Sequence, residues 1–171
     1  MKILAISCSA SHNSGNYYLL QAIAELIQEH DEVEVYQGLY DFALFSPQRL
    51  KKGIPKNIAE LKSKIKTADA LLLSTPEYTH NIPAVLKNLI EWCTASGEFS
   101  AKKVVAITFT PHSPRGEHAM SSLLASLKTM EANTLAQLPI YRNEVAIRDQ
   151  HIELTKEQKE IVKGLIELLK G

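Results

Sequence analysis

The chain has 171 residues, and its 45% hydrophobic and 22% charged residues are ordinary proportions for one globular domain with a substantial core. Its 19 basic residues balance 19 acidic ones, which gives no support to a nucleic-acid-binding protein, to binding of an anionic membrane or to a carrier that docks through one charged face. Two cysteines form no disulfide framework, the apolar start is too short for a signal peptide, and no apolar run approaches the ~20 residues that span a bilayer. We therefore expect a single domain over residues 1–171, located in the cytoplasm.

The first half of the chain alternates short apolar runs with segments of helical period. Residues 2–7 are apolar without alternation, as expected for a strand buried on both faces, and residues 19–27 predict an amphipathic helix. Residues 32–36 alternate polar and apolar side chains, which is typical of a strand nearer the sheet edge. No period is visible over 38–53, which we expect to be a long surface loop. Residues 56–67 predict a helix with a solvated face formed by Lys56, Lys62, Lys64 and Lys66.

The second half repeats this alternation. Strands are predicted at 69–74, at 103–109 and within 134–147, and helices at 82–93, at 120–130 and from Leu154 onward. We expect Thr155 to be the N-cap of the last helix. Its buried stripe is predicted to contain Ile161, Val162, Leu165, Leu168 and Leu169. Strands that alternate with helices in this way predict an α/β fold with a doubly wound parallel sheet.

Ligands of such sheets bind beyond the carboxyl ends of the strands, which directs attention to the loops after Ser7, Ser74 and Phe109. The first loop, residues 8–16, is rich in short hydroxyl and amide side chains and leads into a helix N-terminus. It could hold a phosphate monoester through these groups without any lysine. It is neither a Walker A loop nor a dinucleotide fingerprint, since its only glycine is Gly15. The alternative is a polar loop whose serines only cap the helix.

The second loop, residues 75–81, is bounded by prolines and is therefore stiff, so its amides could face a planar ligand with little ordering cost. Tyr78 could stack on or flank a ring, and His80 could line the same pocket. A rigid connection with exposed polar residues explains this composition equally well.

Both loops resemble signatures of the NADPH-dependent FMN reductase family, which includes quinone, chromate and azo-dye reductases. Members typically begin with a strand followed by Gly-Ser-Leu-Arg-x-x-Ser-x-Asn, and here Cys-Ser-Ala-Ser-His-Asn-Ser-Gly-Asn stands at 8–16. A second signature, Pro-Glu-Tyr-Asn and then Ile-Pro-x-x-Leu-Lys-Asn-x-Ile-x-Trp, is matched by Pro-Glu-Tyr-Thr at 76–79 and by 82–92. The resemblance implies a flavodoxin-like three-layer sandwich with a five-stranded parallel sheet of order 2-1-3-4-5. It also implies bound FMN, NADPH or NADH as donor, and a homodimer or homotetramer.

The resemblance assigns the site residues as follows. The FMN phosphate is expected to be held by Ser9, Ser11, Ser14 and Asn16, and Asn13 is also expected to bind the cofactor. The isoalloxazine is expected to be flanked by Pro76, Glu77, Tyr78, Thr79, His80, Asn81, Thr110, Pro111 and His112. Because the flavin carries the redox chemistry, no catalytic acid, base or nucleophile is required of the protein. Electrons would pass from the nicotinamide to a quinone, a flavin or a similar acceptor in a ping-pong scheme.

Three substitutions separate the chain from the family pattern. Cys8 replaces a glycine, Ser11 replaces the arginine of the phosphate loop, and Thr79 replaces an asparagine. They bear on FMN affinity and on donor preference, and Arg115 could supply the lost charge. A family member without flavin is therefore one alternative. A flavodoxin-type electron carrier is another, although such carriers are usually strongly acidic and this chain has no net charge.

The remaining reactive side chains give weaker signals. The histidines His12, His80, His112 and His118 lack the spacing of a metal site, so no bound metal is expected. Cys8 could be a reactive thiol near a helix N-terminus, but a small buried residue in place of glycine is the preferred interpretation.

Overall fold

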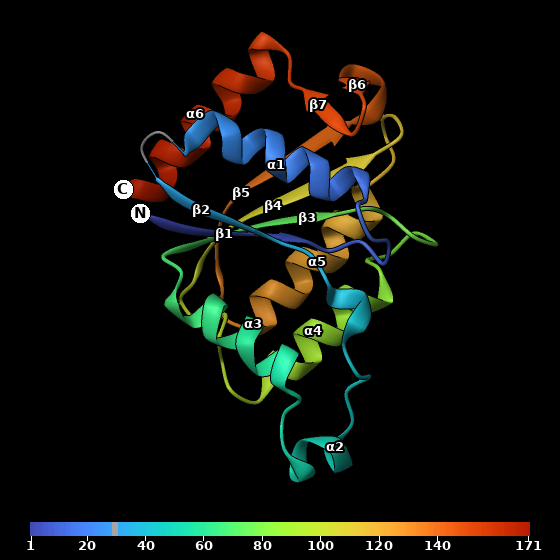
Figure 1. Ribbon diagram of the computed structural model, residues 1–171, viewed down its shortest axis with the longest axis vertical. Coiled ribbons are helices and arrows are strands. Elements are labelled where there is room, and N and C mark those ends of the chain that lie inside the picture. Colours follow the sequence, from blue (N-terminus) through green and yellow to red (C-terminus); the bar gives the residue numbers. More distant parts are fainter. Residues whose placement is uncertain (29–30) are drawn as a thin grey trace.

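The computed structural model describes residues 1–28 and 31–171, and its centre is a five-stranded parallel sheet (Figure 1). The sheet order is β2-β1-β3-β4-β5, which confirms the predicted doubly wound, flavodoxin-like topology. The strands are β1 (Lys2–Ser7), β2 (Glu32–Tyr36), β3 (Ala70–Thr75), β4 (Lys103–Thr110) and β5 (Asn133–Tyr141). The switch in strand order lies between β1 and β3, where the crossovers leave the sheet in opposite directions.

Helices cover both faces of the sheet and complete three layers (Figure 1). One face carries α1 (Gly15–Ile27) and α6 (Lys156–Lys170), and the other carries α3 (Lys56–Thr67), α4 (Ala84–Thr94) and α5 (Glu117–Thr129). Successive strand residues point to opposite faces, so the sheet divides the apolar interior into two cores. In β1, Ile3 and Ala5 pack in the core beneath α1 and α6, whereas Leu4 and Ile6 pack in the core on the other face.

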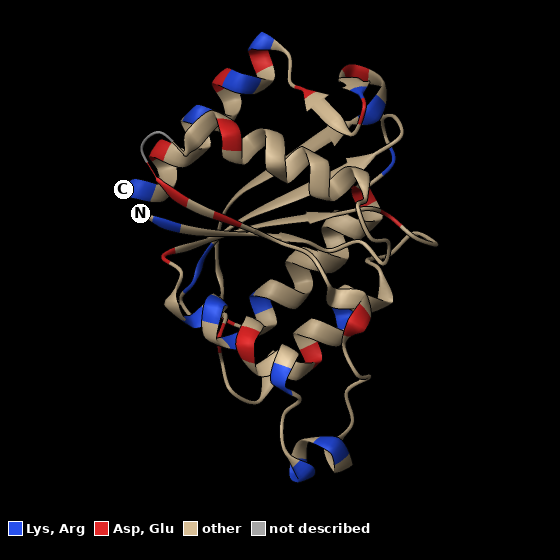
Figure 2. Ribbon diagram, viewed as in Figure 1, with Lys and Arg blue, Asp and Glu red and all other residues tan. Residues whose placement is uncertain are grey.

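The segment predicted as a loop over 38–53 instead contains a short 3-10 turn at Leu39–Asp41 and the helix α2 (Pro47–Lys52). The Ser46 hydroxyl accepts the N–H of Arg49 at the start of α2. Six residues are too few to show a helical period, so only this cap and Pro47 at the first turn could have indicated the helix. α2 projects from the body of the molecule, buries no residue and carries a basic cluster (Figures 1 and 2).

The region after β5 is more regular than the sequence suggests. It contains a 3-10 turn at Arg142–Glu144 and an antiparallel pair, β6 (Ala146–Arg148) and β7 (His151–Glu153). α6 begins with the predicted N-cap. The Thr155 hydroxyl accepts the N–H of Gln158, and the side-chain oxygen of Gln158 accepts the N–H of Thr155. Its predicted stripe was wrong at Ile161 and Leu168, which are 43% and 48% exposed. The buried residues of this helix are Val162, Ile166 and Leu169.

The lysine-rich helix α3 has the predicted bounds, but one of its lysines was misplaced by sequence analysis. Lys62 is buried rather than solvated. It lies four residues after Ile58 and three before Ile65, on the apolar stripe of the helix.

Across the described residues, no helix combines the length and apolarity that crossing a membrane requires.

Candidate functional site

The carboxyl edge of the sheet concentrates the polar interior of the protein. Of the ten buried polar or charged residues in the described chain, seven lie at or beside the ends of β1, β3 and β4. They are Ser7, Ser9, Asn16, Ser74, Thr75, Thr108 and Thr110. A buried polar side chain is costly unless it is hydrogen-bonded. The polar residues are therefore concentrated at the edge where open α/β sheets generally bind ligands.

The first loop ends in a capped helix N-terminus, as its serines suggested. Ser14 is the N-cap of α1, and its hydroxyl accepts the N–H of Tyr17 at 3.3 Å while lying 3.3 Å from the Ser7 hydroxyl. Gly15 and Asn16 occupy the first two helical positions, whose N–H groups have no acceptor inside a helix. These two amides and the positive end of the helix dipole form an anion-binding arrangement at the switch point of the sheet.

Ser9 and Ser11 form a tight turn inside this loop. The buried Ser9 hydroxyl accepts the N–H of Ser11 at 3.2 Å and lies 3.5 Å from the hydroxyl of Tyr78. Ser11 is exposed. The first loop therefore contacts the second loop through Tyr78, and the exposed Ser11 side chain is accessible to a ligand.

Asn13 is held from outside the loop. Its N–H donates to the side-chain oxygen of Gln37 at 3.0 Å, and the Gln37 amide donates to its side-chain oxygen at 3.2 Å. His12 makes a similar outward contact, with its ring bonded to the hydroxyl of Tyr40. Neither partner could be predicted from the sequence, because nothing in the 37–40 segment marks it as a neighbour of the first loop.

Asn16 and Gly15 fix the start of α1 over the sheet. The side-chain oxygen of Asn16 accepts the hydroxyl of Ser74 at 2.8 Å in the interior, so Asn16 joins α1 to β3. A Cβ atom on Gly15 would lie 3.0 Å from the ring of Phe109, at the end of β4. The absence of a side chain at Gly15 lets the helix begin directly above the strands.

The second loop is a tight hairpin. Tyr78 and Asn81 exchange both backbone hydrogen bonds, at 2.9 and 3.0 Å. Thr79 and His80 between them both have positive φ, 50° and 54°, the backbone of a type I′ turn. Tyr78 is 43% exposed, and Pro76 is half-buried at the base of the hairpin. The residues of the second loop that were predicted to flank a planar ligand thus form one stiff unit.

Glu77 is turned toward α5. Its carboxylate accepts the N–H groups of His118 and Ala119, each at 3.1 Å, and its side chain is only 8% exposed. Glu77 therefore caps the first turn of α5 from the second loop, a contact between residues about 40 positions apart that no sequence pattern indicated.

The third loop follows β4. The buried Thr110 hydroxyl donates to the carbonyl of Arg115 at 2.7 Å, and the carbonyl of Pro111 accepts the N–H of Asn143 at 3.2 Å. His112 is exposed, with its ring against the carbonyl of Ser113 at 2.9 Å. The third loop therefore lies at the carboxyl end of β4, and its residues Pro111 and His112 are exposed.

Both cysteines are buried, as the preferred interpretation of Cys8 requires. Burial raises the pKa of the Cys8 thiol far above its usual range, and the thiol faces the carbonyl of Ile6 at 3.4 Å. Burial, and then the nearby Glu98 carboxylate, raises the pKa of Cys93 to about 12.

We expect the folded protein to show no fast reaction with a thiol-specific disulfide reagent at pH 8, and two reactive thiols after denaturation. Rapid labelling of Cys8 in the native protein would contradict this.

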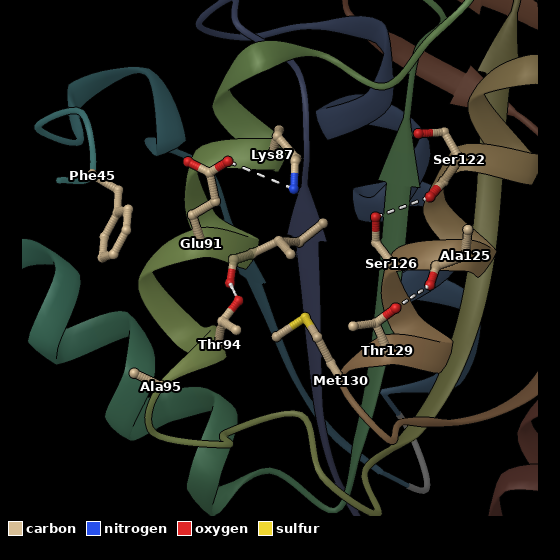
Figure 3. Close-up of a pocket in the computed structure, with 11 residues that line it drawn as sticks. Phe45, Lys87, Glu91, Thr94, Ala95, Ser122, Ala125, Ser126, Thr129 and Met130 are labelled. Atoms are coloured by element: carbon tan, nitrogen blue, oxygen red, sulfur yellow. Dashed lines mark hydrogen bonds and ion pairs between the residues drawn. The ribbon is translucent and has the colours of Figure 1, made fainter. Parts of the chain in front are cut away.

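A separate cavity of about 750 Å³ lies between α4 and α5 (Figure 3). The Lys87–Glu91 ion pair borders it on α4, and small side chains of α5 border it on the other side. The lining residues are Phe45, Lys87, Ile90, Glu91, Thr94, Ala95, Ser122, Ala125, Ser126, Thr129 and Met130. No residue predicted to hold FMN lines this cavity, so it is distinct from the polar edge of the sheet.

Comparison with known proteins agrees with this architecture. FerB, a flavoenzyme NAD(P)H:(acceptor) oxidoreductase from Paracoccus denitrificans, superposes with a TM-score of 0.77 at 20% identity, over 99% of this chain and 95% of that one. Subunit CrdA of an NADH:(hydroxy)cinnamate reductase of Vibrio ruber is 34% identical over 116 residues, 68% of this chain and 56% of that protein. An NAD(P)H-dependent FMN reductase of Pseudomonas aeruginosa is 33% identical over 60% of this chain and 56% of its own length.

The chain spans about half the length of the curated relatives that it matches. The model of the NADPH-dependent FMN reductase family matches residues 1–145, which contain all three loops at the carboxyl edge of the sheet. The chain belongs to the NADPH-dependent FMN reductase family.

Proposed function

We propose that the protein is an FMN-dependent NAD(P)H oxidoreductase that passes electrons from NADPH or NADH to a quinone, a flavin or a similar small acceptor. The observation that carries the proposal is the first loop. It presents free N–H groups of α1 and serine hydroxyls at the switch point of a flavodoxin-like sheet, in a member of an FMN reductase family. Two relatives whose names state quinone or FMN reduction support the acceptor class.

The residues present fit FMN in the chemistry of their donors. In this proposal the amides of Gly15 and Asn16 bind the phosphate together with Ser9, Ser11, Asn13 and Ser14. The hairpin 76–81 and residues 110–112 orient the ring system, and the Glu77 bonds to α5 keep the hairpin in place. When bound, FMN supplies the hydride and electron chemistry, so the chain contributes binding and orientation.

One site that serves the donor and the acceptor in turn predicts ping-pong kinetics. Initial rates measured against both substrates should give parallel double-reciprocal lines. Intersecting lines, which show that both substrates are bound together, would overturn this part of the proposal.

The alternatives make different predictions. A non-enzymatic carrier would exchange electrons with a protein partner, usually through an acidic face, whereas acidic and basic residues alternate along the helices of this chain (Figure 2). A member without flavin would show no FMN binding at all.

The visible absorption spectrum decides between these classes. The purified protein, or the protein mixed with FMN, should show flavin bands that bleach when NADPH or NADH is added without oxygen. A colourless protein that takes up no FMN would end the enzyme proposal. Flavin bands that no nicotinamide bleaches would favour the carrier.

Restoring the family arginine at Ser11 tests the phosphate position. The exposed Ser11 lies in the first loop, which leads to the first N–H groups of α1, and an arginine there would add a charge-assisted bond to a phosphate. We expect Ser11→Arg to tighten FMN binding about tenfold in a fluorescence-quenching titration. The control is riboflavin, which lacks the phosphate and should bind both proteins equally. An equal gain for riboflavin would place the phosphate elsewhere.

We further propose that the protein forms a homodimer or homotetramer in the cytoplasm. The cavity between α4 and α5, with small side chains along α5, supports an interface on this face (Figure 3). Two free, buried thiols are typical of a reducing compartment. Light scattering that shows only monomer at micromolar concentration would rule out the oligomer.

A further inference from the structure

Three ionisable side chains gather where the second loop meets α5. Glu77 accepts two N–H bonds from the first turn of α5, and its other carboxylate oxygen lies 3.5 Å from the ring nitrogen of His80. The rings of His80 and His118 meet edge to face, with centroids 4.8 Å apart. No group of three potential ligands in the described part of the chain could hold a metal ion, so this cluster needs a different explanation.

We infer that Glu77 is a positioning residue that clamps the second loop to α5, and that the histidine pair makes the clamp sensitive to pH. The consequence for FMN, though not the clamp itself, rests on the proposed function. The hairpin is stiff, with its turn fixed by two backbone bonds. A stiff hairpin moves as a unit, so a bond at Glu77 sets the position of Tyr78 and of the turn beyond it.

The charges of Glu77, His80 and His118 determine how the contact between the second loop and α5 responds to pH. When neither histidine carries a charge, the Glu77 carboxylate alone complements the positive end of α5. One proton on His80 is balanced by Glu77 at 3.5 Å. A second proton on His118 has no further carboxylate in the cluster, and it adds a cation next to another cation and to the helix N-terminus. We therefore expect the contact between loop and helix to loosen when both histidines are charged.

Other titratable groups on these elements face elsewhere. The hydroxyl of Tyr78 lies against Ser9, and the ring of His112 lies against the carbonyl of Ser113. Arg115 and Glu117 line a groove between α5 and β5. Glu117 also lies in the first turn of α5, so it is a matched control: it has the same charge and the same dipole environment but a different neighbour.

Amide hydrogen exchange on the protein without ligand tests the clamp directly. Glu77→Gln should lower the protection factors of the His118 and Ala119 amides about tenfold at pH 7.5, because a neutral amide is a weaker acceptor than a carboxylate. Glu117→Gln should leave those protection factors within twofold of the parent. Equal effects of the two variants, or no effect of Glu77→Gln, would overturn the clamp.

The pH arm uses His118→Gln, which keeps the His80–Glu77 pair. Between pH 7.5 and pH 5.0 the protection factor of Ala119 should fall about tenfold in the parent and stay within twofold in His118→Gln. An equal fall in both proteins would assign the change to Glu77 alone and overturn the role of the histidine pair. FMN titrations at the two pH values complete the test: a parallel loss of affinity in the parent alone is expected. If no FMN binds at either pH, the proposed function fails while the exchange data still decide the clamp.

Discussion

Gly116→Ala should lower the free energy of unfolding by about 3 kcal/mol, because the substitution meets two obstacles at once. Gly116 has a φ of +105°, which L-amino acids with a side chain rarely adopt. A Cβ atom there would also lie 3.1 Å from the Thr108 hydroxyl and 3.2 Å from the Thr110 methyl. Both threonines are buried in β4. Urea denaturation followed by circular dichroism measures the loss.

Gly97→Ala is the control. Gly97 also has a positive φ, +70°, but no atom lies within 4 Å of its added Cβ. This variant should lose about 1 kcal/mol from backbone strain alone. The difference of about 2 kcal/mol measures the close approach of the third loop to β4. Equal losses in the two variants would show that this approach is not tight. Because Gly116 precedes α5 and joins it to the third loop, Gly116→Ala should also weaken FMN binding.

Lys62→Met is expected to cost about 3–5 kcal/mol, the range found when one partner of a buried ion pair is removed. The Lys62 ammonium donates to the carbonyl of Trp92 at 2.8 Å and to the Ser96 hydroxyl at 2.5 Å, and lies 3.4 Å from the Glu98 carboxylate. The side chains of Lys62 and Glu98 are 7% and 9% exposed. The variant would leave a carboxylate in the interior without its cation. Chemical denaturation measures the loss.

Lys64→Met, on the same helix, is the control. Lys64 pairs with Glu34, but both side chains are about 40% exposed, and such pairs contribute at most about 1 kcal/mol. The double variant Lys62→Met, Glu98→Gln should recover part of the stability, because the orphaned charge is gone. The loss of stability in the double variant could instead equal the sum of the losses in Lys62→Met and Glu98→Gln. In that case the two residues act independently, and the broken ion pair does not cause the instability of Lys62→Met.

The sheet and the placement of the three candidate loops at its carboxyl edge could be predicted because both depend on local patterns. Apolar runs of strand length, helical periods between them and the rule for open α/β sheets place the ligand loops after β1, β3 and β4. Lys62 could have been predicted too, because its spacing from Ile58 puts it on the buried stripe, but lysine content alone suggests a solvated face. The contact of Glu77 with α5 could not, since it depends on where two distant loops meet in space.

The sheet also separates two apolar cores whose strand residues alternate along the chain. Substitutions in one core share few contacts with the other, so their effects on stability should add. During evolution, each layer of helices can therefore change its side chains while the other layer remains as it was. Such separate drift is consistent with a solved structure that keeps this fold over 99% of the chain at 20% identity. The polar edge, where Asn16 of α1 is hydrogen-bonded to Ser74 of β3, lacks this freedom.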